Sequence, residues 1–218
     1  SEATYHIEQT EIFTGDLELE ESLEPSEETL RKLVLMYALI RKQQKMKSKG
    51  KGKGNGEKTF ASPTPSSDGK LVFVTTGTGE VVAFDLEGAE KWRFNAQERY
   101  GKFRYGFGFH STTVLHEGRL YLQLIHSAAQ LVVCVEANSG KEVWKVERES
   151  DGVAECEHSY ASPTAYREGD LNVLVTHGND YCIGHDPGTG KELWRVAGLN
   201  PKEQYNRTLR FVASPVVS

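Results

Sequence analysis

The sequence predicts an all-β fold, a β-propeller in which each blade is a sheet of four short strands. The 218 residues contain three tryptophans, Trp92, Trp144 and Trp194, which stand 52 and 50 residues apart. An acidic residue and a turn with glycine come before each of them, as in the run Asp186-Pro187-Gly188-Thr189-Gly190 ahead of Trp194. A motif that returns at such even spacing indicates a repeat, and about 50 residues per unit suit a propeller blade.

Each unit also shows four strand-like segments in a fixed order. An opening segment rich in Ser, Pro and Thr is followed by an alternating apolar segment, then by an apolar segment that runs into the acidic turn, and last by the segment with the tryptophan. The openings are Ala61-Ser62-Pro63-Thr64, His110-Ser111-Thr112-Thr113, Ala161-Ser162-Pro163-Thr164 and Ala213-Ser214-Pro215-Val216. We therefore expect a partial propeller over 59–218, an incomplete ring with blades at about 59–95, 109–148 and 158–197 and the first strand of a fourth at 211–218.

The apolar segments explain why the blades need one another. They are apolar on both faces, as in Leu71-Val72-Phe73-Val74, so each sheet has to be covered on both sides. Stacking the blades face to face provides this cover, and the tryptophans then belong in the seams, where an indole buries about 150–250 Å². The turn glycines supply a backbone with positive φ. The residues that we expect to dock the blades are Trp92, Trp144, Trp194, Gly88, Gly140, Gly190, Asp85 and Asp186.

The first 58 residues form an N-terminal extension without the repeat. Ser26 is a good N-cap, and apolar residues at helical spacing follow it, so we expect a helix over about 27–47. Alternating Lys and Gly predict a flexible linker over 48–58. Two alternatives stay open for each: the helix packs on the side of the propeller or docks a partner, and the linker is a solvated loop or a basic tether for anionic groups.

Composition excludes several classes of protein. A net charge of -5 gives no reason to expect nucleic-acid binding, and the absence of a run of about 18 apolar residues predicts no membrane span. Cys134, Cys156 and Cys182 lack the spacing of a zinc site. The chain opens without Met and stops inside a strand-like segment, so we expect a fragment of a larger propeller, in which the lack of a signal segment is uninformative.

Two histidines are the candidates for a ligand site. His110 and His158 each stand at the start of a first strand, and such positions open toward one end of a propeller's central channel. Together with Arg104 and Arg210 they predict a site for an anion or another polar ligand. The alternative is that these side chains satisfy backbone groups at the strand ends.

A run of aromatic residues and glycines connects the first two blades. It extends from Tyr100 to Phe109 and includes Phe103 and Tyr105. Rings of this kind stack on ligands, carbohydrates and other polymers among them. The alternative is a glycine-rich crossover between blades.

At the acidic turns the sequence resembles the PQQ-like (pyrrolo-quinoline quinone) β-propeller repeats. The family pattern, roughly Ala-x-Asp-x-x-Thr-Gly-x-x-x-Trp, stands here as Gly184-His185-Asp186-Pro187-Gly188-Thr189-Gly190-Lys191-Glu192-Leu193-Trp194. The similarity covers about 59–218 and is greatest to the BamB-like propellers of bacteria. It implies rings of seven or eight blades, partners that are proteins or the remaining blades, and a periplasmic or extracytoplasmic location.

The same resemblance raises the question of enzymatic activity. Quinoprotein dehydrogenases of this family hold the quinone between a tryptophan and a vicinal disulfide and bind calcium through Glu, Asn and Asp. The sequence has no adjacent cysteines, so we assign no catalytic, cofactor-binding or metal-binding residue. We expect a non-enzymatic scaffold for a protein or ligand. The alternatives are an oxidoreductase that depends on PQQ and calcium, and a secreted propeller that binds carbohydrate or another polymer.

Overall fold

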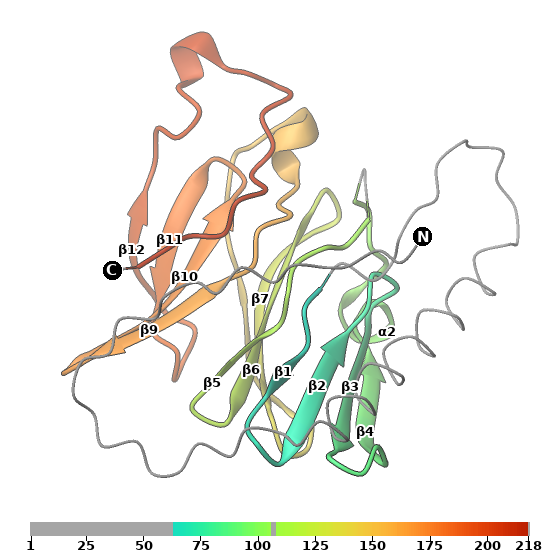
Figure 1. Cartoon of the computed structure of the whole chain (residues 1–218). Coiled ribbons are helices and arrows are strands. Elements are labelled where there is room, and N and C mark those ends of the chain that lie inside the picture. Colours follow the sequence, from blue (N-terminus) through green and yellow to red (C-terminus); the bar gives the residue numbers. More distant parts are fainter. Residues whose placement is uncertain (1–62, 106–107, 218) are drawn as a thin grey trace, which may run out of the picture.

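Three four-stranded antiparallel sheets stand side by side in the computed structural model, which describes residues 63–105 and 108–217 (Figure 1). Each sheet is built from four consecutive strands, in the orders β1-β2-β3-β4, β5-β6-β7-β8 and β9-β10-β11-β12. This arrangement confirms the predicted all-β fold of four-stranded repeats. The predicted helix at 27–47 and linker at 48–58 lie outside the described residues.

The strand bounds follow the repeat. The first sheet contains β1 (Ser66–Ser67), β2 (Leu71–Thr75), β3 (Glu80–Asp85) and β4 (Glu90–Asn95). The second contains β5 (Val114–His116), β6 (Arg119–His126), β7 (Ala129–Glu136) and β8 (Glu142–Glu147). The third contains β9 (Thr164–Glu168), β10 (Leu171–Gly178), β11 (Tyr181–His185) and β12 (Glu192–Val196).

Within 63–105 and 108–217, three short helical segments lie outside the sheets. Helix α2 (Ala96–Tyr100) follows the first sheet, and two 3₁₀ turns, η1 (Ala154–Glu157) and η2 (Lys202–Gln204), lie before and after the third. Asn95 caps α2, because its side chain accepts hydrogen bonds from the backbone of the first turn. A helix of five residues has no periodic apolar stripe, so sequence patterning does not reveal it.

A bulge occurs at the same position of every sheet. The register shifts between the third and fourth strands, at Ala83, Cys134 and Gly184, each of which lies opposite the tryptophan of its own sheet. The shift is a β-bulge, which bends the strand and increases its twist. A small residue at this point leaves room for the neighbouring indole.

The acidic turns after the bulge hold the fourth strand in place. Asp85 accepts a hydrogen bond from Ala89 N at 2.7 Å, and Asp186 accepts one from Thr189 N at 2.8 Å. The turn glycines have φ of 88° at Gly88, 64° at Gly140 and 77° at Gly190, which is the region that favours glycine.

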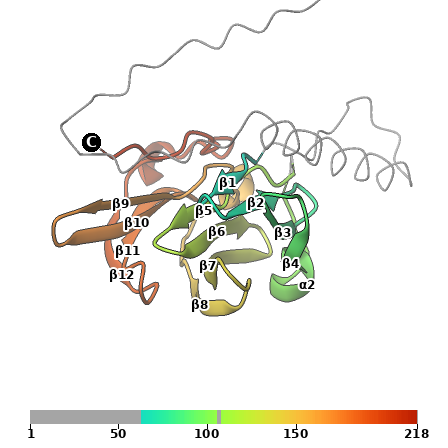
Figure 2. The same ribbon diagram turned by 60° about the horizontal axis from the view of Figure 1, so that its bottom comes forward.

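Two clusters of buried apolar side chains fill the seams between the sheets, which are arranged like a fan in Figure 2. One buried cluster joins the first two sheets and includes Phe73, Leu120 and Val133. A second joins the second and third sheets through Cys134 and Leu174. Full burial of a side chain such as Leu120 contributes about 1.5–3 kcal/mol, so each sheet depends on its neighbour.

Candidate functional site

The tryptophans of the first two sheets bind the sheet that follows. Trp92 Nε1 donates to Ala137 O at 2.9 Å, and Trp144 Nε1 donates to Pro187 O at 3.0 Å. Each acceptor directly follows the acidic residue of a turn. The turn glycine covers the indole, because a Cβ on Gly140 would lie 2.8 Å from Trp92 Cε3. Each seam therefore combines a carbonyl acceptor with a glycine that fits over a ring.

A belt of hydroxyl groups runs along the opening segments of the units. Thr64 N donates to Thr112 Oγ1 at 3.0 Å, Thr112 N to Ser162 Oγ at 2.8 Å, and Ser162 N to Ser214 Oγ at 2.9 Å. Comparison of the opening segments in the sequence places Ser111 at the position of Ser162. In the structure, Thr112 instead supplies the hydroxyl group of the belt. Thr112 and Ser162 both stand 32 residues before their tryptophan, and that spacing is the signal that identifies the position.

The structure gathers part of the predicted ligand site around one tyrosine. The rings of His110 and His158 lie 6.0 and 6.4 Å from the ring of Tyr160. Arg104 comes close enough to lower the pKa of a neighbouring histidine, His126. Arg210 instead forms an ion pair with Glu155 in η1. Of the four predicted residues, three thus share a neighbourhood and one is engaged elsewhere.

His126 is the central histidine of this neighbourhood, and sequence reasoning did not select it. It is 1% exposed, and its Nδ1 accepts a hydrogen bond from Ala128 N at 3.2 Å, so a neutral ring carries its proton on Nε2. Burial lowers its pKa to about 4, and the nearby His158 and Arg104 act in the same direction. The ring is therefore neutral at pH 7.

The aromatic run between the first two sheets is used for packing. Phe103 lies 5.6 Å from Tyr105 and 5.0 Å from Phe109, measured between ring centres. Phe109 is 2% exposed, and the hydroxyl of Tyr105 accepts a hydrogen bond from Ile125 N at 3.1 Å. These contacts make the rings part of the core between the sheets.

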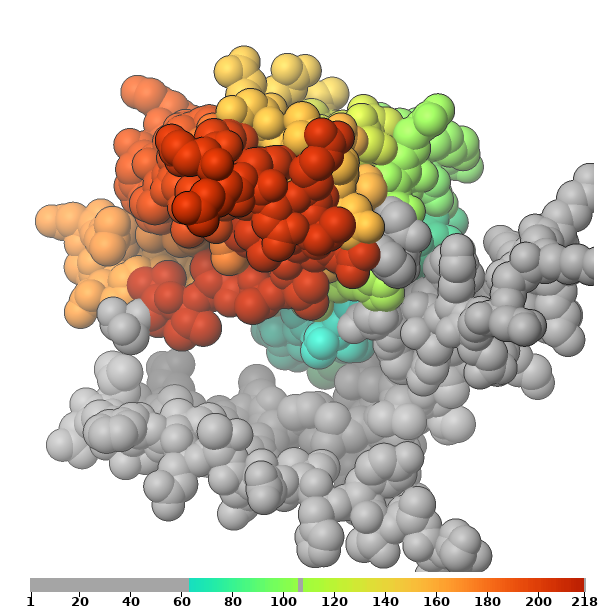
Figure 3. Space-filling view, turned by 90° about the horizontal axis from the view of Figure 1, so that it is seen from above, coloured from blue at the N-terminus to red at the C-terminus, as the bar shows by residue number. Residues whose placement is uncertain are grey.

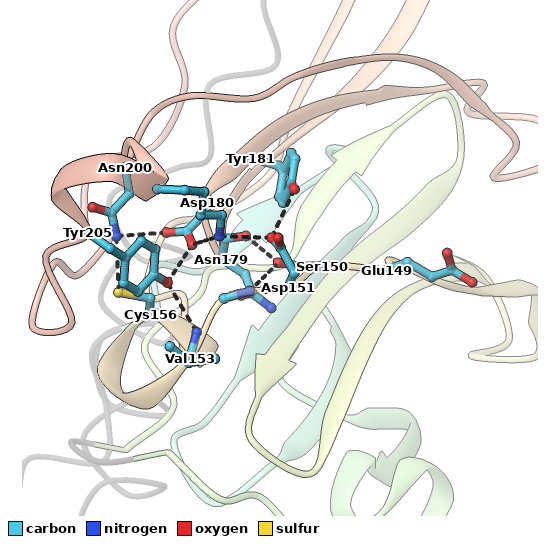
Figure 4. Close-up of polar contacts among 12 residues, drawn as sticks. Glu149, Ser150, Asp151, Val153, Cys156, Asn179, Asp180, Tyr181, Asn200 and Tyr205 are labelled. Atoms are coloured by element: carbon cyan, nitrogen blue, oxygen red, sulfur yellow. Dashed lines mark hydrogen bonds and ion pairs between the residues drawn. The ribbon is translucent and has the colours of Figure 1, made fainter.

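A buried carboxylate organises the loops beside the third sheet (Figure 4). Asp180 is 2% exposed and accepts hydrogen bonds from Tyr205 Oη at 2.5 Å, Asn200 Nδ2 at 3.1 Å and Lys202 Nζ at 3.2 Å. Lys202 also bonds Asp151 at 3.0 Å. We call these five residues the Asp180 hub. These three donors satisfy the buried carboxylate and tie the loop residues to the end of the third sheet.

The hub fixes the segment that follows β12. Tyr205 Oη accepts a hydrogen bond from Val153 N at 3.1 Å, and Glu155 N donates to Arg207 O at 3.2 Å. The space-filling view shows the C-terminal segment beside the connection around residue 150, at one end of the molecule (Figure 3). Burial and the neighbouring Asp180 raise the pKa of Tyr205, so its hydroxyl stays protonated and keeps donating.

A surface cleft of about 940 Å³ lies between α2 and the strands β7 and β8 of the second sheet. Arg99 and Lys145 line it together with Glu147 and Glu149, so its charges are mixed. The Arg99 guanidinium lies 3.9 Å above the Phe94 ring and donates to Gly140 O at 2.8 Å. Both contacts tie Arg99 to the seam between the sheets.

Neither a metal cluster nor a membrane-spanning helix occurs among the described residues. No group of three or more His, Cys, Asp or Glu side chains there is placed to hold a metal ion. No helix within these residues has the length and apolar character needed to cross a membrane.

The fold and the seams define a β-propeller of the PQQ-like repeat class. The model of the family described as outer membrane protein assembly factor BamB matches residues 41–218, and the chain belongs to this family. A search of curated proteins found no match.

Several solved structures are similar to part of the chain at low sequence identity. Quinohemoprotein alcohol dehydrogenase from Comamonas testosteroni is 19% identical with a TM-score of 0.50, over 63% of this chain and 21% of that one. BamB from Moraxella catarrhalis is 17% identical with a TM-score of 0.45, over 64% of this chain and 39% of that one. A europium-containing methanol dehydrogenase is 19% identical with a TM-score of 0.45, over 64% and 25%. The chain thus spans well under half the length of these proteins.

The similarity to the quinohemoprotein alcohol dehydrogenase raises the question of whether a quinone would fit the described residues. Trp92 and Trp144 already occupy seams, with their Nε1 atoms bound to carbonyls. The three free cysteines lie apart, in β7, η1 and β11. These residues do not fit the quinone site that the resemblance implies.

Proposed function

We propose that this chain is part of a larger, non-enzymatic propeller scaffold of the cell envelope, which binds a protein partner or further blades through the outer face of its third sheet. The envelope location rests on the description of the matched family as an outer membrane assembly factor. The observation that carries the proposal is the state of the third tryptophan. Trp194 is 41% exposed and has no hydrogen-bond partner among the described residues, whereas its counterparts are bound in seams.

The surface around Trp194 is apolar like the seams, but no neighbouring sheet of the described residues covers it. Leu193 and Val196 are each 50% exposed on the same strand, β12, and Leu199 beyond it is 37% exposed. Clusters of exposed apolar side chains mark interaction sites on soluble proteins. In the two formed seams, the indole contacts a backbone carbonyl and a turn glycine of the next sheet. We expect the surface around Trp194 to bind a sheet that offers the same two groups.

The test compares native complexes of variants in the source cells. Trp194→Ala removes the indole, and Leu171→Ala is the matched control because Leu171 is 51% exposed at the start of β10, which β11 separates from β12. We expect native electrophoresis of cell-envelope extracts to show that Trp194→Ala shifts the protein from a large particle to a smaller one, and that Leu171→Ala does not. Identical migration of all three proteins would refute docking of a separate protein partner on this face.

A separate assay decides between scaffold and oxidoreductase. PQQ and Ca²⁺ are added to the full-length native protein, and the absorbance spectrum and the melting temperature are recorded. We expect neither to change. A quinone spectrum shifted by binding, together with a raised melting temperature, would support the oxidoreductase instead.

A further inference from the structure

A buried arginine joins the second sheet to the third. Arg148 directly follows β8 and is 1% exposed. Its Nε donates to Thr176 Oγ1 in β10 at 3.0 Å, and its Nη2 donates to Tyr181 O in β11 at 2.6 Å. No carboxylate forms an ion pair with it in the part of the chain that the structure describes, and its Nη1 has no acceptor there. The seam thus contains a buried cation that is held by neutral oxygen atoms.

His185 continues this contact into the acidic turn of the third sheet. The ring is 2% exposed, with Nε2 3.0 Å from Thr176 Oγ1 and Nδ1 3.1 Å from Gly190 O. A carbonyl only accepts, so Nδ1 carries a proton. The Thr176 hydroxyl accepts from Arg148 and donates to Nε2. The chain of donors is therefore fixed: Arg148 to Thr176, Thr176 to His185, and His185 to Gly190.

A second proton on His185 disrupts this chain. Nε2 then becomes a donor, and the hydroxyl proton of Thr176 must turn to Ile183 O, which is 3.4 Å away. The imidazolium and the Arg148 guanidinium would point at the same oxygen inside the seam, where like charges repel strongly. Glu192 favours the charged ring, but the same carboxylate is bound by Arg195.

The other charges near the turn do not remove this repulsion. Arg119 in β6 adds a further cation on the second sheet's side, with its Nη1 3.3 Å from Pro187 O. Burial lowers the pKa of His185 to about 4, and both Arg148 and Arg195 act in the same direction. The closed seam therefore selects the neutral ring.

We propose that Arg148, Thr176 and His185 form a proton-responsive latch, which keeps the second and third sheets together when His185 is neutral and releases the seam when His185 takes up a second proton. The energetic reason is linkage. An open seam hydrates the ring and restores its affinity for protons, so acid favours the open state. Because the latch stands on contacts within the chain, it does not depend on the proposed docking face.

Cys134 provides the readout of opening. Its side chain is fully buried in the seam between the second and third sheets, against Leu174. The full chain is treated with 2,2′-dithiodipyridine, a thiol reagent that stays active in mild acid, at several pH values from 7.5 to 5. Modification of Cys134 is followed by peptide mass spectrometry and normalised to the rate for a small free thiol at the same pH.

The latch predicts that the normalised rate at Cys134 rises as the pH falls below about 6.5, by up to roughly tenfold per pH unit for one proton. Cys156, which is buried beside Asn200 outside this seam, is the internal control and should lag behind. A flat pH profile at Cys134 would overturn the proposal. Parallel labelling of Cys134 and Cys156 would overturn it too, because opening would then be global.

Two variants identify the responsible group. His185→Gln retains hydrogen-bonding atoms but does not titrate, so the acid dependence at Cys134 should disappear. His126→Gln, the matched control, removes another buried histidine and should leave the dependence in place. If His185→Gln does not fold, nitrogen NMR of the unsubstituted protein decides: the latch requires the Nδ1–H tautomer at pH 7.5, and an Nε2–H tautomer would contradict it.

Discussion

Replacing the glycine that covers an indole should destabilise the seam far more than replacing a glycine in an open turn. An alanine Cβ at Gly190 would lie 2.6 Å from Trp144 Cε3 and 2.9 Å from Val146 Cγ1. Overpacking of this kind costs about 1–3 kcal/mol. The φ of 77° adds about 1–2 kcal/mol for a left-handed alanine. We therefore expect Gly190→Ala to lower the free energy of unfolding by about 2–5 kcal/mol.

Gly118→Ala is the matched control for this prediction. Gly118 has φ of 71°, close to that of Gly190, but nothing lies within 4 Å of its Cβ position. Only the cost of a left-handed alanine applies here, so we expect the free energy of unfolding to fall by about 1–2 kcal/mol. Urea unfolding with an unchanged m-value gives both numbers. Equal losses in the two variants would refute the idea that the turn glycine is needed to receive the indole.

Three further predictions concern other parts of the structure. Asp180→Asn removes a buried charge that receives three hydrogen bonds and should cost about 2–4 kcal/mol in urea unfolding; a loss below 0.5 kcal/mol would contradict the hub. Because the folded protein holds His126 and His185 neutral, with a pKa of about 4 each, stability should fall as the pH drops from 6.5 toward 4, by up to about 1.4 kcal/mol per unit for each ring. Rising stability in thermal melts over this range would refute it. Gly184→Ala places a Cβ 2.2 Å from Trp194 Cε2, so acrylamide should quench the displaced indole more strongly, and unchanged quenching would count against that contact.

The repeat was predictable because its signals are local. The acidic turn, its glycine and the following tryptophan lie within ten residues of one another, and their backbone requirements show directly in residue type. The alternation of apolar residues then places four strands per unit. These features depend on short-range chemistry, and for this reason the three sheets follow the predicted order.

The contacts between units were not predictable because they join residues that are far apart. The opening register is set by bonds such as Thr112 to Ser162, which spans 50 positions. The latch joins Arg148 to Thr176 across 28 positions, and neither residue belongs to a recognisable motif. Arginine side chains are usually exposed, so the sequence gives no sign that Arg148 is buried in a seam.

The predicted ligand site shows the same limit. His110 and His158 stand at the starts of first strands, and both rings lie against Tyr160. Arg210 follows the third unit in sequence, but its charge is paired with Glu155. The positions in the sequence predict that the two histidines lie near each other. The partner of each side chain depends on its direction, and the folded loops set that direction.

Oxidative footprinting of Trp194 in the native assembly tests the central claim most directly. Hydroxyl radicals are applied to cell-envelope extract and to the isolated 218-residue chain, and oxidation of Trp194 is compared with that of Trp92, which is already docked. The scaffold account predicts that Trp194 is protected in the extract, to about the level of Trp92, and reactive in the isolated chain. Equal, high reactivity of Trp194 in both samples would contradict it, because the outer face of the third sheet would then have no partner.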